Sequence, residues 1–281
     1  MTPVNAMTCD VEDWFQVQAF AGVIRREDWE TLPRRVEANM DRVLAAFAAA
    51  GVHGTFFTLG WIAERHPSLV RRIVAEGHEL ASHGHGHARV DQLGREAFRA
   101  DVRRARQTLE DTGGVPIRGY RAPTFSIGPR TAWAHQVLEE EGYRYSSSVF
   151  PVRHDLYGDP AAPRFPYRPP GRDALQELPL TTLRLRGRNL PCAGGGYFRL
   201  MPYALFRLAL RRYNRTEGRP GVFYFHPWEI DPGQPHVPAA SRLSRFRHRV
   251  NLGAMPDRLD RLLRDFQWDR MDRAFAPALA S

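Results

Sequence analysis

The residue types best suited to chemistry gather in two short clusters. One follows the apolar run 79–82 and alternates histidine with glycine; its histidines are His83, His85 and His87. The other ends an apolar run near the start of the chain; its carboxylates are Asp10, Glu12 and Asp13. Neutral imidazole is the commonest metal ligand in proteins, and a zinc site needs several ligands held in fixed positions. The two clusters together indicate a metal-binding site.

The elements that must position these clusters are strands and helices in alternation. Apolar runs that predict strands lie at 4–12, 53–59, 79–82, 117–121, 143–149, 175–186 and 221–225. Apolar residues at helical spacing predict helices at 33–50, 61–76 (interrupted near Pro67), 98–109, 130–141 and 255–266. Repeated β-α units form parallel strands with helical crossovers, and chains of this length often close such a sheet. The sequence therefore predicts an α/β fold of the (β/α) barrel type.

Polar residues fall where four of the predicted strands end. Asp10 closes the first strand, His83 follows the third, Arg121 ends the fourth and His226 follows the late run 221–225. In a β/α barrel the carboxyl ends of the parallel strands meet on one face, where active sites form. We therefore expect these four residues to share one rim.

The second half of the chain is less regular. Residues 157–172 are rich in proline and glycine and are interpreted as a loop. The stretch 193–199 lacks the glycine spacing of a nucleotide-binding fingerprint, so we interpret it as a tight turn that brings Tyr197 and Arg199 to the rim. We expect residues 1–230 to form the catalytic barrel and residues 231–281 to form a C-terminal extension that packs on it.

Composition narrows the classes of function. All 40 basic residues are arginine, and the net charge is +9. Without lysine, the chain cannot form a Schiff base or use a phosphate-loop lysine. The arginines are spread over every segment and accompany no nucleic-acid-binding motif. We therefore expect no nucleic-acid partner.

The sequence also carries an expectation about location. It has no apolar run near the ~20 residues that a membrane span needs. Residues 1–7 lack the basic and apolar segments of a secretory signal. The two cysteines, Cys9 and Cys192, do not indicate a disulfide framework and fit a reducing compartment. We expect a cytoplasmic protein without a membrane span.

Four motifs in chain order resemble those of the polysaccharide deacetylases of carbohydrate esterase family 4. They are DVEDWFQV at 10–17, SHGHGH at 82–87, YRAPTFS at 120–126 and FHPWE at 225–229. They are most similar to the branch associated with exosortase and exopolysaccharide clusters, and the resemblance extends from Val4 to about Phe266. It implies a distorted (β/α) barrel that uses a divalent metal, with zinc as the first choice, to remove N-acetyl groups from an amino sugar polysaccharide or its precursor. Proteins of exopolysaccharide biosynthesis would be its partners.

The resemblance assigns roles within the histidine cluster. It implies that His83 and His87 bind the metal, and it leaves His85 in solvent or in support of the ligands. A divalent metal with open positions polarises the amide carbonyl and activates a water molecule for attack.

The acidic cluster would be divided between two roles. The family pattern uses one carboxylate as general base, matched by Asp10, and a following one as metal ligand. Strand periodicity places residues 10 and 12 on the same face, which favours Glu12 as the ligand. Asp13 is the alternative if the strand ends at Val11. The sequence departs here from the family's commoner pair of adjacent aspartates.

Two further motif residues complete the implied machinery. Arg121 resembles the arginine that pairs with the base carboxylate and orients it. His226 resembles the acid that protonates the leaving amine. The sequence has Ser146 where the family has an aspartate, and Asp155 is the candidate to compensate for it.

Four aromatic residues are candidates for contacts with the sugar. Tyr224 stands where the family often has a leucine against the acetyl methyl group. Trp228 and Phe125 either line the sugar groove or pack in the core. Tyr197 is expected at the same rim.

Two rival functions share these features. A related hydrolase that acts on a cyclic imide or ureide would have the same metal site. A catalytically inactive homologue would bind the sugar without releasing acetate.

Overall fold

The computed structural model describes residues 3–280, which build a parallel sheet curved into an open barrel. The strands of this sheet are β1 (Asn5–Val11), β2 (Thr55–Thr58), β3 (Glu79–Ser82), β4 (Gly119–Tyr120), β5 (Tyr145–Ser146), β6 (Gln176–Glu177), β9 (Val222–Phe225) and β10 (Trp268–Asp269). Their order is β10-β1-β2-β3-β4-β5-β6, and β9 pairs with β1. Within the described residues no ladder joins β6 to β9, so the barrel stays open there. The predicted distorted (β/α) barrel is confirmed.

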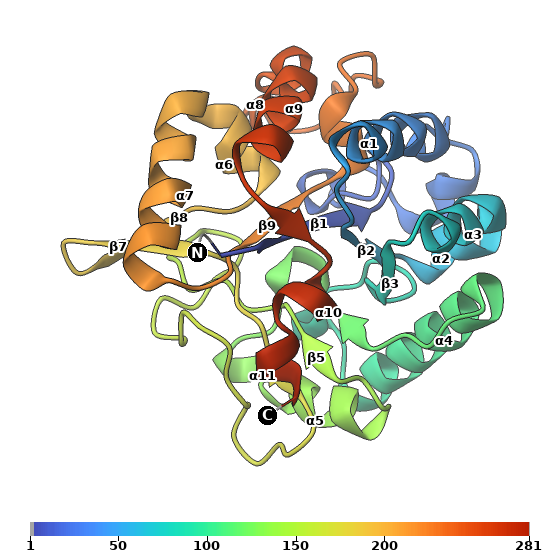
Figure 1. The fold of residues 1–281 in the computed structure, drawn as a ribbon. Coiled ribbons are helices and arrows are strands. Elements are labelled where there is room, and N and C mark those ends of the chain that lie inside the picture. Colours follow the sequence, from blue (N-terminus) through green and yellow to red (C-terminus); the bar gives the residue numbers. More distant parts are fainter. Residues whose placement is uncertain (1–2, 281) are drawn as a thin grey trace.

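Helices surround this sheet. The longer ones are α1 (Val36–Ala50), α3 (Pro67–Ala75), α4 (Arg95–Gly113), α5 (Trp133–Glu140), α7 (Tyr203–Glu217), α8 (Arg242–Arg249) and α9 (Met255–Asp265). The shorter ones are α2 (Gly60–Arg65), α6 (Gly195–Leu200), α10 (Met271–Ala274) and α11 (Ala276–Ala280). In Figure 1, α1 to α4 lie on the right of the sheet, α7 lies on the left, and α8 and α9 lie at the top.

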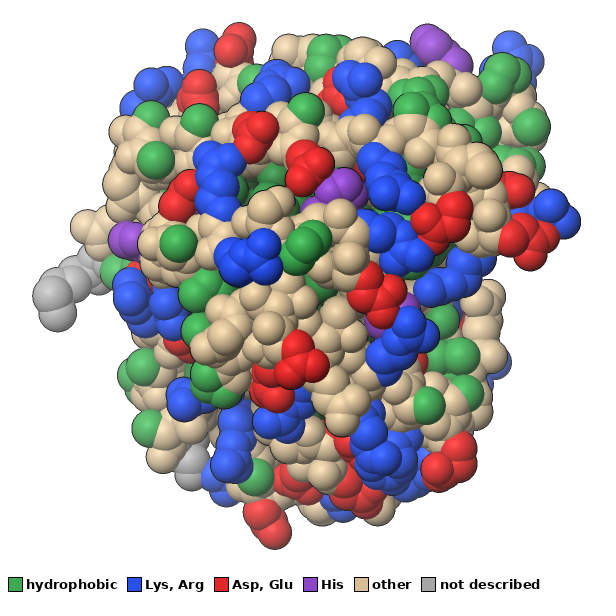
Figure 2. Space-filling model, turned by 90° about the vertical axis from the view of Figure 1, so that its right-hand side faces the viewer, with side chains coloured by type: hydrophobic (Ala, Val, Ile, Leu, Met, Phe, Trp, Pro, Cys, Tyr) green, Lys and Arg blue, Asp and Glu red, His purple; other side chains and the backbone are tan. Residues whose placement is uncertain are grey.

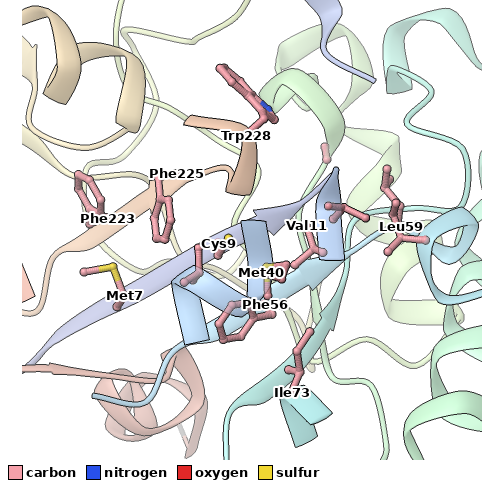
Figure 3. Packing of buried hydrophobic residues seen from close by; sticks show 14 of the residues in the cluster. Met7, Cys9, Val11, Met40, Phe56, Leu59, Ile73, Phe223, Phe225 and Trp228 are labelled. Atoms are coloured by element: carbon pink, nitrogen blue, oxygen red, sulfur yellow. The ribbon is translucent and has the colours of Figure 1, made fainter. Parts of the chain in front are cut away.

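Side chains of the strands alternate between the helices and the barrel interior. On β1, Met7, Cys9 and Val11 belong to the core beneath the helices, together with Met40 of α1 and Phe56 of β2 (Figure 3). The residues between them, at positions 6, 8 and 10, point into the barrel. The strand that carries the first polar cluster is therefore buried on both faces.

The predicted strand 175–186 is wrong as one continuous element. It divides into β6 and β7 (Thr182–Leu185), and β7 pairs antiparallel with β8 (Arg188–Pro191) outside the main sheet. Pro179 lies between β6 and β7 and lacks the N–H that a ladder needs. The hairpin turn has two residues with positive φ, a conformation that suits a tight turn between antiparallel strands.

The predicted turn at 193–199 is also wrong in part, because α6 begins inside it. Gly194 has a φ of 90° and precedes the helix. A side chain there would come within 2.6 Å of the Tyr224 ring, and one at Gly195 would collide with the Glu229 carboxylate. Glycine is therefore needed where α6 packs against the end of β9.

Helices α7 and α8 lie in stretches where the sequence analysis predicts no element. The buried face of α7 has apolar residues at helical spacing, but Leu205 and Leu208 are exposed outside it and obscure the pattern. Helix α8 buries only His248. A sequence without a clear apolar stripe gives little helical signal.

The end of the chain returns to the sheet. Strand β10 pairs in parallel with the start of β1, where Trp268 lies opposite Asn5. Helix α9 packs against α1. The predicted division into residues 1–230 and an extension 231–281 stays a prediction.

Arginine and acidic side chains are intermingled on the face shown in Figure 2. On α3 and α4, which lie on this side of the molecule, Arg72 pairs with Glu76 and Arg99 pairs with Glu140 and Glu141. No helix among the residues that the structure describes is long and apolar enough to cross a membrane.

Candidate active site

Parallel strand ends bring the predicted rim residues together. Asp10 lies near the end of β1, His83 follows β3, Arg121 follows β4 and His226 follows β9. Because these strands run in parallel, their carboxyl ends lie on one side of the barrel. Asp10, His83 and His226 line one cavity of about 150 Å³ together with Glu12.

Glu12, His83 and His87 form a group that could hold a metal ion. Their ligand atoms lie within 4.8 Å of one another. Glu12 Oε2 is buried and lies 2.7 Å from His87 Nε2. Lone pairs of a carboxylate oxygen and an imidazole nitrogen can lie this close in a buried site only when a proton or a metal ion is shared between them. Two imidazoles and one carboxylate therefore fit a catalytic metal site with an open position.

His83 is held in the tautomer that a metal ligand needs. Its Nδ1 lies 2.8 Å from the backbone oxygen of Arg121. This oxygen can only accept, so Nδ1 carries the proton and Nε2 keeps its lone pair. Burial lowers the pKa of His83 to about 4, although Asp10 and Glu12 oppose the shift. The ring is therefore neutral at physiological pH, and Nε2 is free to bind.

The loop with the histidines is shaped by its backbone and by Asp101 of α4. Gly84 and His87 have positive φ values of 77° and 55°, and the second is uncommon for a residue other than glycine. The Asp101 carboxylate accepts hydrogen bonds from the N–H groups of His85 and Gly86, at 3.0 and 3.3 Å. Such strain persists where the surroundings enforce it. Here it turns His87 toward the other ligands.

Asp13, the alternative metal carboxylate, does not lie with this group. Its Oδ2 accepts hydrogen bonds from the N–H groups of Arg35 and Val36, at 2.7 and 3.1 Å, at the start of α1. Strand β1 does end at Val11, but the alternation continues for one more residue. Glu12 therefore points inward with position 10, and Asp13 points toward the helix.

His85 also lies outside the ligand group. Its Nε2 is 2.9 Å from a Glu64 carboxylate oxygen, which accepts a second bond from Arg104. This agrees with the prediction that His85 supports the ligands or faces solvent and does not bind the metal.

Arg121 fixes the position of Asp10. The guanidinium is fully buried, and Nη1 donates to Asp10 Oδ1 at 2.6 Å and to Thr8 Oγ1 at 2.8 Å. Its Nε and Nη2 donate to the backbone oxygen and the hydroxyl of Ser147, both at 3.1 Å. The charge-assisted bond holds one Asp10 oxygen, and the other, Oδ2, lies 4.0 Å from Nε2 of His226.

His226 lies against the carboxylates. Its Nε2 is 3.7 Å from Glu12 Oε1, and its Nδ1 is 3.4 Å from Glu229 Oε2. The Glu229 oxygen also accepts the backbone N–H of His226, at 2.9 Å. Burial lowers the pKa of His226, but Glu12, Glu229 and Asp10 outweigh it and raise the pKa to about 9. The imidazole is therefore protonated at neutral pH in the metal-free protein.

A buried ion pair lies behind His226. Arg199 Nε donates to Glu229 Oε1 at 3.0 Å, and both side chains are almost completely buried. Burial opposes the charge on Glu229, but Arg199 and His226 lower the pKa of this carboxyl below its usual value. Arg199, predicted to reach the rim, lines a groove beside His226 and Trp228, where its guanidinium holds Glu229.

The carboxylate beside His226 belongs to Glu229, which the sequence did not predict for this role. Ser146, where the resemblance predicts an aspartate, is buried in β5. Asp155, the predicted substitute, is exposed and pairs with Arg247 at 2.8 Å, so that prediction is wrong. The carboxylate beside His226 comes instead from the 3₁₀ turn Pro227–Ile230, which places Glu229 three residues after the histidine.

Three of the four predicted aromatic residues line the catalytic cavity. They are Phe125, Tyr224 and Trp228. The Trp228 indole N–H donates to Glu12 Oε1 at 3.1 Å, and its ring stacks on His226 with centroids 5.1 Å apart. Tyr224 and Phe125 meet edge to face at 4.7 Å. Trp228 therefore touches both the ligand carboxylate and the candidate acid.

Tyr197, the fourth, lines an adjoining groove. Its hydroxyl lies close to that of Tyr157, which lines both the groove and the cavity of Asp10 and His226.

Sequence reasoning did not assign roles to Glu229 or Asp101. Glu229 lies within the FHPWE motif, so its acidic side chain three residues after His226 was an available signal. Asp101 lies on the polar face of the predicted helix 98–109, and nothing in the sequence indicates that it contacts the histidine loop.

Two protein families match adjacent parts of the chain. Residues 29–146 match the family described as polysaccharide deacetylase, and residues 147–276 match one described as a domain of unknown function, DUF3473. The first segment contains His83, His87 and Arg121. The second contains His226 and Glu229.

Curated relatives match a shorter stretch. The chain is 36% identical over 97 residues to a chitooligosaccharide deacetylase of Sinorhizobium fredii, covering 34% of this chain and 42% of the relative. It is 28% identical over 82 residues to a peptidoglycan-N-acetylglucosamine deacetylase of Bacillus cereus, covering 29% of this chain and 30% of the relative. The matches thus span less than half of either relative.

Solved structures resemble the whole fold. A candidate polysaccharide deacetylase from Mycobacterium smegmatis aligns with a TM-score of 0.63 and 22% identity, covering 99% of this chain and 91% of that one. A peptidoglycan N-acetylglucosamine deacetylase aligns with a TM-score of 0.52 and 14% identity, covering 97% and 88%. At these identities the likeness concerns the fold.

Proposed function

We propose that this chain is a metal-dependent hydrolase that removes N-acetyl groups from an amino sugar polysaccharide or its precursor, because residues 29–146 match the family described as polysaccharide deacetylase. The relatives named as chitooligosaccharide and peptidoglycan-N-acetylglucosamine deacetylases support this class of substrate.

One observation carries the proposal. The group of Glu12, His83 and His87 shares a single cavity with the carboxylate Asp10 and the imidazole His226. Hydrolysis of an amide needs an activated carbonyl, a base for the attacking water and an acid for the leaving amine. The cavity holds a residue set for each of these tasks.

Asp10 is the proposed base. Arg121 holds its position through a buried hydrogen bond, Thr8 accepts a second bond from the same guanidinium nitrogen, and Oδ2 of Asp10 remains directed to the cavity. It would take a proton from the water that attacks the acetyl carbon. A carboxylate fixed in this way needs no rearrangement when the reaction starts.

His226 is the proposed acid. In the metal-free protein its raised pKa keeps a proton on the ring at neutral pH, and Nε2 faces the two cavity carboxylates. This proton would pass to the amine nitrogen as the C–N bond breaks. Glu229 orients the ring through Nδ1, and Arg199 holds Glu229 in turn.

Glu12, His83 and His87 would hold the metal, and we propose zinc because two imidazoles and one carboxylate are a ligand set typical of catalytic zinc. When bound, such a metal polarises the acetyl carbonyl and increases the acidity of water. The Trp228 N–H would orient Glu12 through the oxygen that faces away from His87.

The biological setting is a further part of the proposal. We propose a role in exopolysaccharide biosynthesis, supported by the four motifs and their order along the chain. A cytoplasmic location is proposed because Cys9 and Cys192 are free and buried.

Metal analysis followed by an acetate-release assay tests the proposal. Purified protein should bind about one divalent ion, and the zinc-loaded form should release acetate from N-acetylglucosamine oligomers. Treatment with a chelator should abolish the release, and zinc should restore it. Ring opening of a cyclic imide or ureide without acetate release would establish the related amidohydrolase instead. Oligomer binding with no turnover of either substrate would establish a sugar-binding protein.

A further inference from the structure

A second hollow adjoins the catalytic cavity. This groove has a volume of about 410 Å³ and shares Leu156, Tyr157, Tyr224, His226 and Trp228 with the cavity. The two spaces therefore meet beside the proposed acid. A substrate whose acetamido group lies in the cavity would extend its neighbouring part into the groove.

Most of the far wall of the groove comes from residues after 195. Tyr197 and Leu200 of α6 and Phe246 of α8 belong to it, and His154 adds a side chain from an earlier loop. His154 stacks on Tyr157 with ring centroids 3.9 Å apart. Rings and aliphatic side chains thus form most of the lining.

The charged and titratable side chains on this wall already have partners within the protein. Arg199 is engaged by Glu229 and by backbone oxygens, and Arg247 is paired with Asp155. His248 Nε2 lies 2.7 Å from the Gln234 side-chain oxygen, and burial lowers the pKa of this histidine to about 3.

Three tyrosines, Tyr157, Tyr197 and Tyr224, gather on the lining, where the hydroxyl of Tyr157 lies close to those of the other two. A second sugar ring would bring several hydroxyl groups that need hydrogen-bond partners. A hydrocarbon needs none.

The mouth of the groove is apolar as well. Leu156, Leu200 and Phe246 are 42%, 55% and 56% exposed. Three large apolar side chains in water at the edge of an active site are typical of a binding surface that a ligand covers.

From these contacts we propose that the groove binds an apolar aglycone, a hydrocarbon chain carried by the amino sugar that is deacetylated. The inference rests on the proposed function and specifies its substrate class as an amino sugar linked to a lipid-like chain. The sugar would lie in the catalytic cavity, and the first methylenes of the chain would pack between Tyr197, Leu200 and Phe246.

Alkyl glycosides test the proposal. Calorimetry would compare the hexyl and methyl β-glycosides of glucosamine, the amine products, with the zinc-loaded protein. Each buried methylene strengthens binding about four-fold, so the hexyl glycoside should bind at least ten-fold more tightly. Acetate release from the N-acetylated pair should show the same preference in kcat/KM.

Single substitutions locate the chain. Leu200→Ser and Phe246→Ser should each reduce the hexyl-to-methyl ratio several-fold, and both positions are exposed enough to keep the fold. Leu208→Ser is the matched control, because Leu208 is 64% exposed on α7 and lies outside the groove lining. It should leave the ratio unchanged.

Several results would overturn the proposal. Equal binding of the two glycosides would show that the groove takes no chain. A hexyl preference that survives both groove substitutions would place the chain elsewhere. Tighter binding of a glucosamine trisaccharide, weakened by Phe246→Ser, would make the groove a sugar subsite. If the hexyl preference holds but no glycoside releases acetate, the groove still binds a hydrocarbon chain, whereas the proposed deacetylase function is wrong.

Discussion

The two halves of the chain divide the site between them. Residues up to 146 supply the candidate metal ligands, Asp10 and Arg121, whereas residues 147–276 supply His226, Glu229 and most of the groove. Residues 1–146 contain 18 arginines and 19 acidic residues, but residues 147–276 contain 22 and 12, so the net positive charge belongs to the second half. Of the large hydrophobic side chains exposed among the described residues, most also lie there. The first half therefore supplies the candidate ligands, and the second half supplies most of the surface proposed to contact the substrate.

The largest effects should come from the ligand positions of the first half. His83→Ala or His87→Ala should abolish both metal binding and acetate release, because two ligands cannot hold a catalytic ion in place. His85→Ala is the matched control from the same loop and should keep most of both, since its ring bonds Glu64. Metal content by mass spectrometry and acetate release measure the outcome. Loss of metal in His85→Ala with retention in His83→Ala would reverse the assignment.

The next effect separates the base from the ligands. In Asp10→Asn the amide keeps the shape of the side chain but cannot accept the proton of the attacking water. Acetate release should fall by roughly 10²–10⁴, mostly in kcat, because the interaction belongs to the transition state. Bound metal should remain. Near-normal turnover would exclude Asp10 as the base, and loss of metal would make it a ligand.

Much of the first half was predictable from local pattern. Asp10, His83 and Arg121 follow apolar runs, and in a parallel barrel the ends of such runs converge. The choice of Glu12 over Asp13 followed from the two-residue period of a strand, which persisted beyond the last residue of β1.

The second half was harder to predict for physical reasons. Glu229 meets Arg199 across 30 residues of sequence, and nothing local indicates that pairing. Helix α8 is rich in arginine and buries only His248, so its sequence gives little helical signal. The hairpin of β7 and β8 depends on two positive φ values that an Arg-Gly pair signals only weakly.

The third prediction concerns the proton on His226 in chelator-treated protein. Its folded pKa, near 9, lies above the usual value of 6.5. A raised pKa stabilises the fold fully below the unfolded value, and this stabilisation is lost as the pH rises from 6.5 through 9. The loss should be on the order of 3 kcal/mol. Urea unfolding at several pH values, compared with His226→Gln, measures it.

Glu229→Gln refines the same test. Glu229 is one of the carboxylates that raise the pKa of His226, so the substitution should lower that pKa. An NMR titration of the His226 ring in both metal-free proteins gives the values directly. An unchanged pKa would mean that Glu12 and Asp10 set it alone and that Glu229 only supports the backbone.

The smallest effect is expected at Asp13, next to the candidate ligand Glu12. Asp13 accepts two N–H groups at the start of α1, so Asp13→Asn should destabilise the fold by about 1 kcal/mol, as the loss of a helix cap does. Metal affinity should stay within two-fold of the native value. Glu12→Gln is the counterpart and should weaken metal binding by at least the ~10–100-fold that changes around a metal site cause. Zinc titration and thermal unfolding of both variants decide between the two carboxylates. If Asp13→Asn loses zinc while Glu12→Gln keeps it, Asp13 is the metal ligand. The side-chain alternation along β1, which places Glu12 on the interior face, would then be the wrong guide to the ligand.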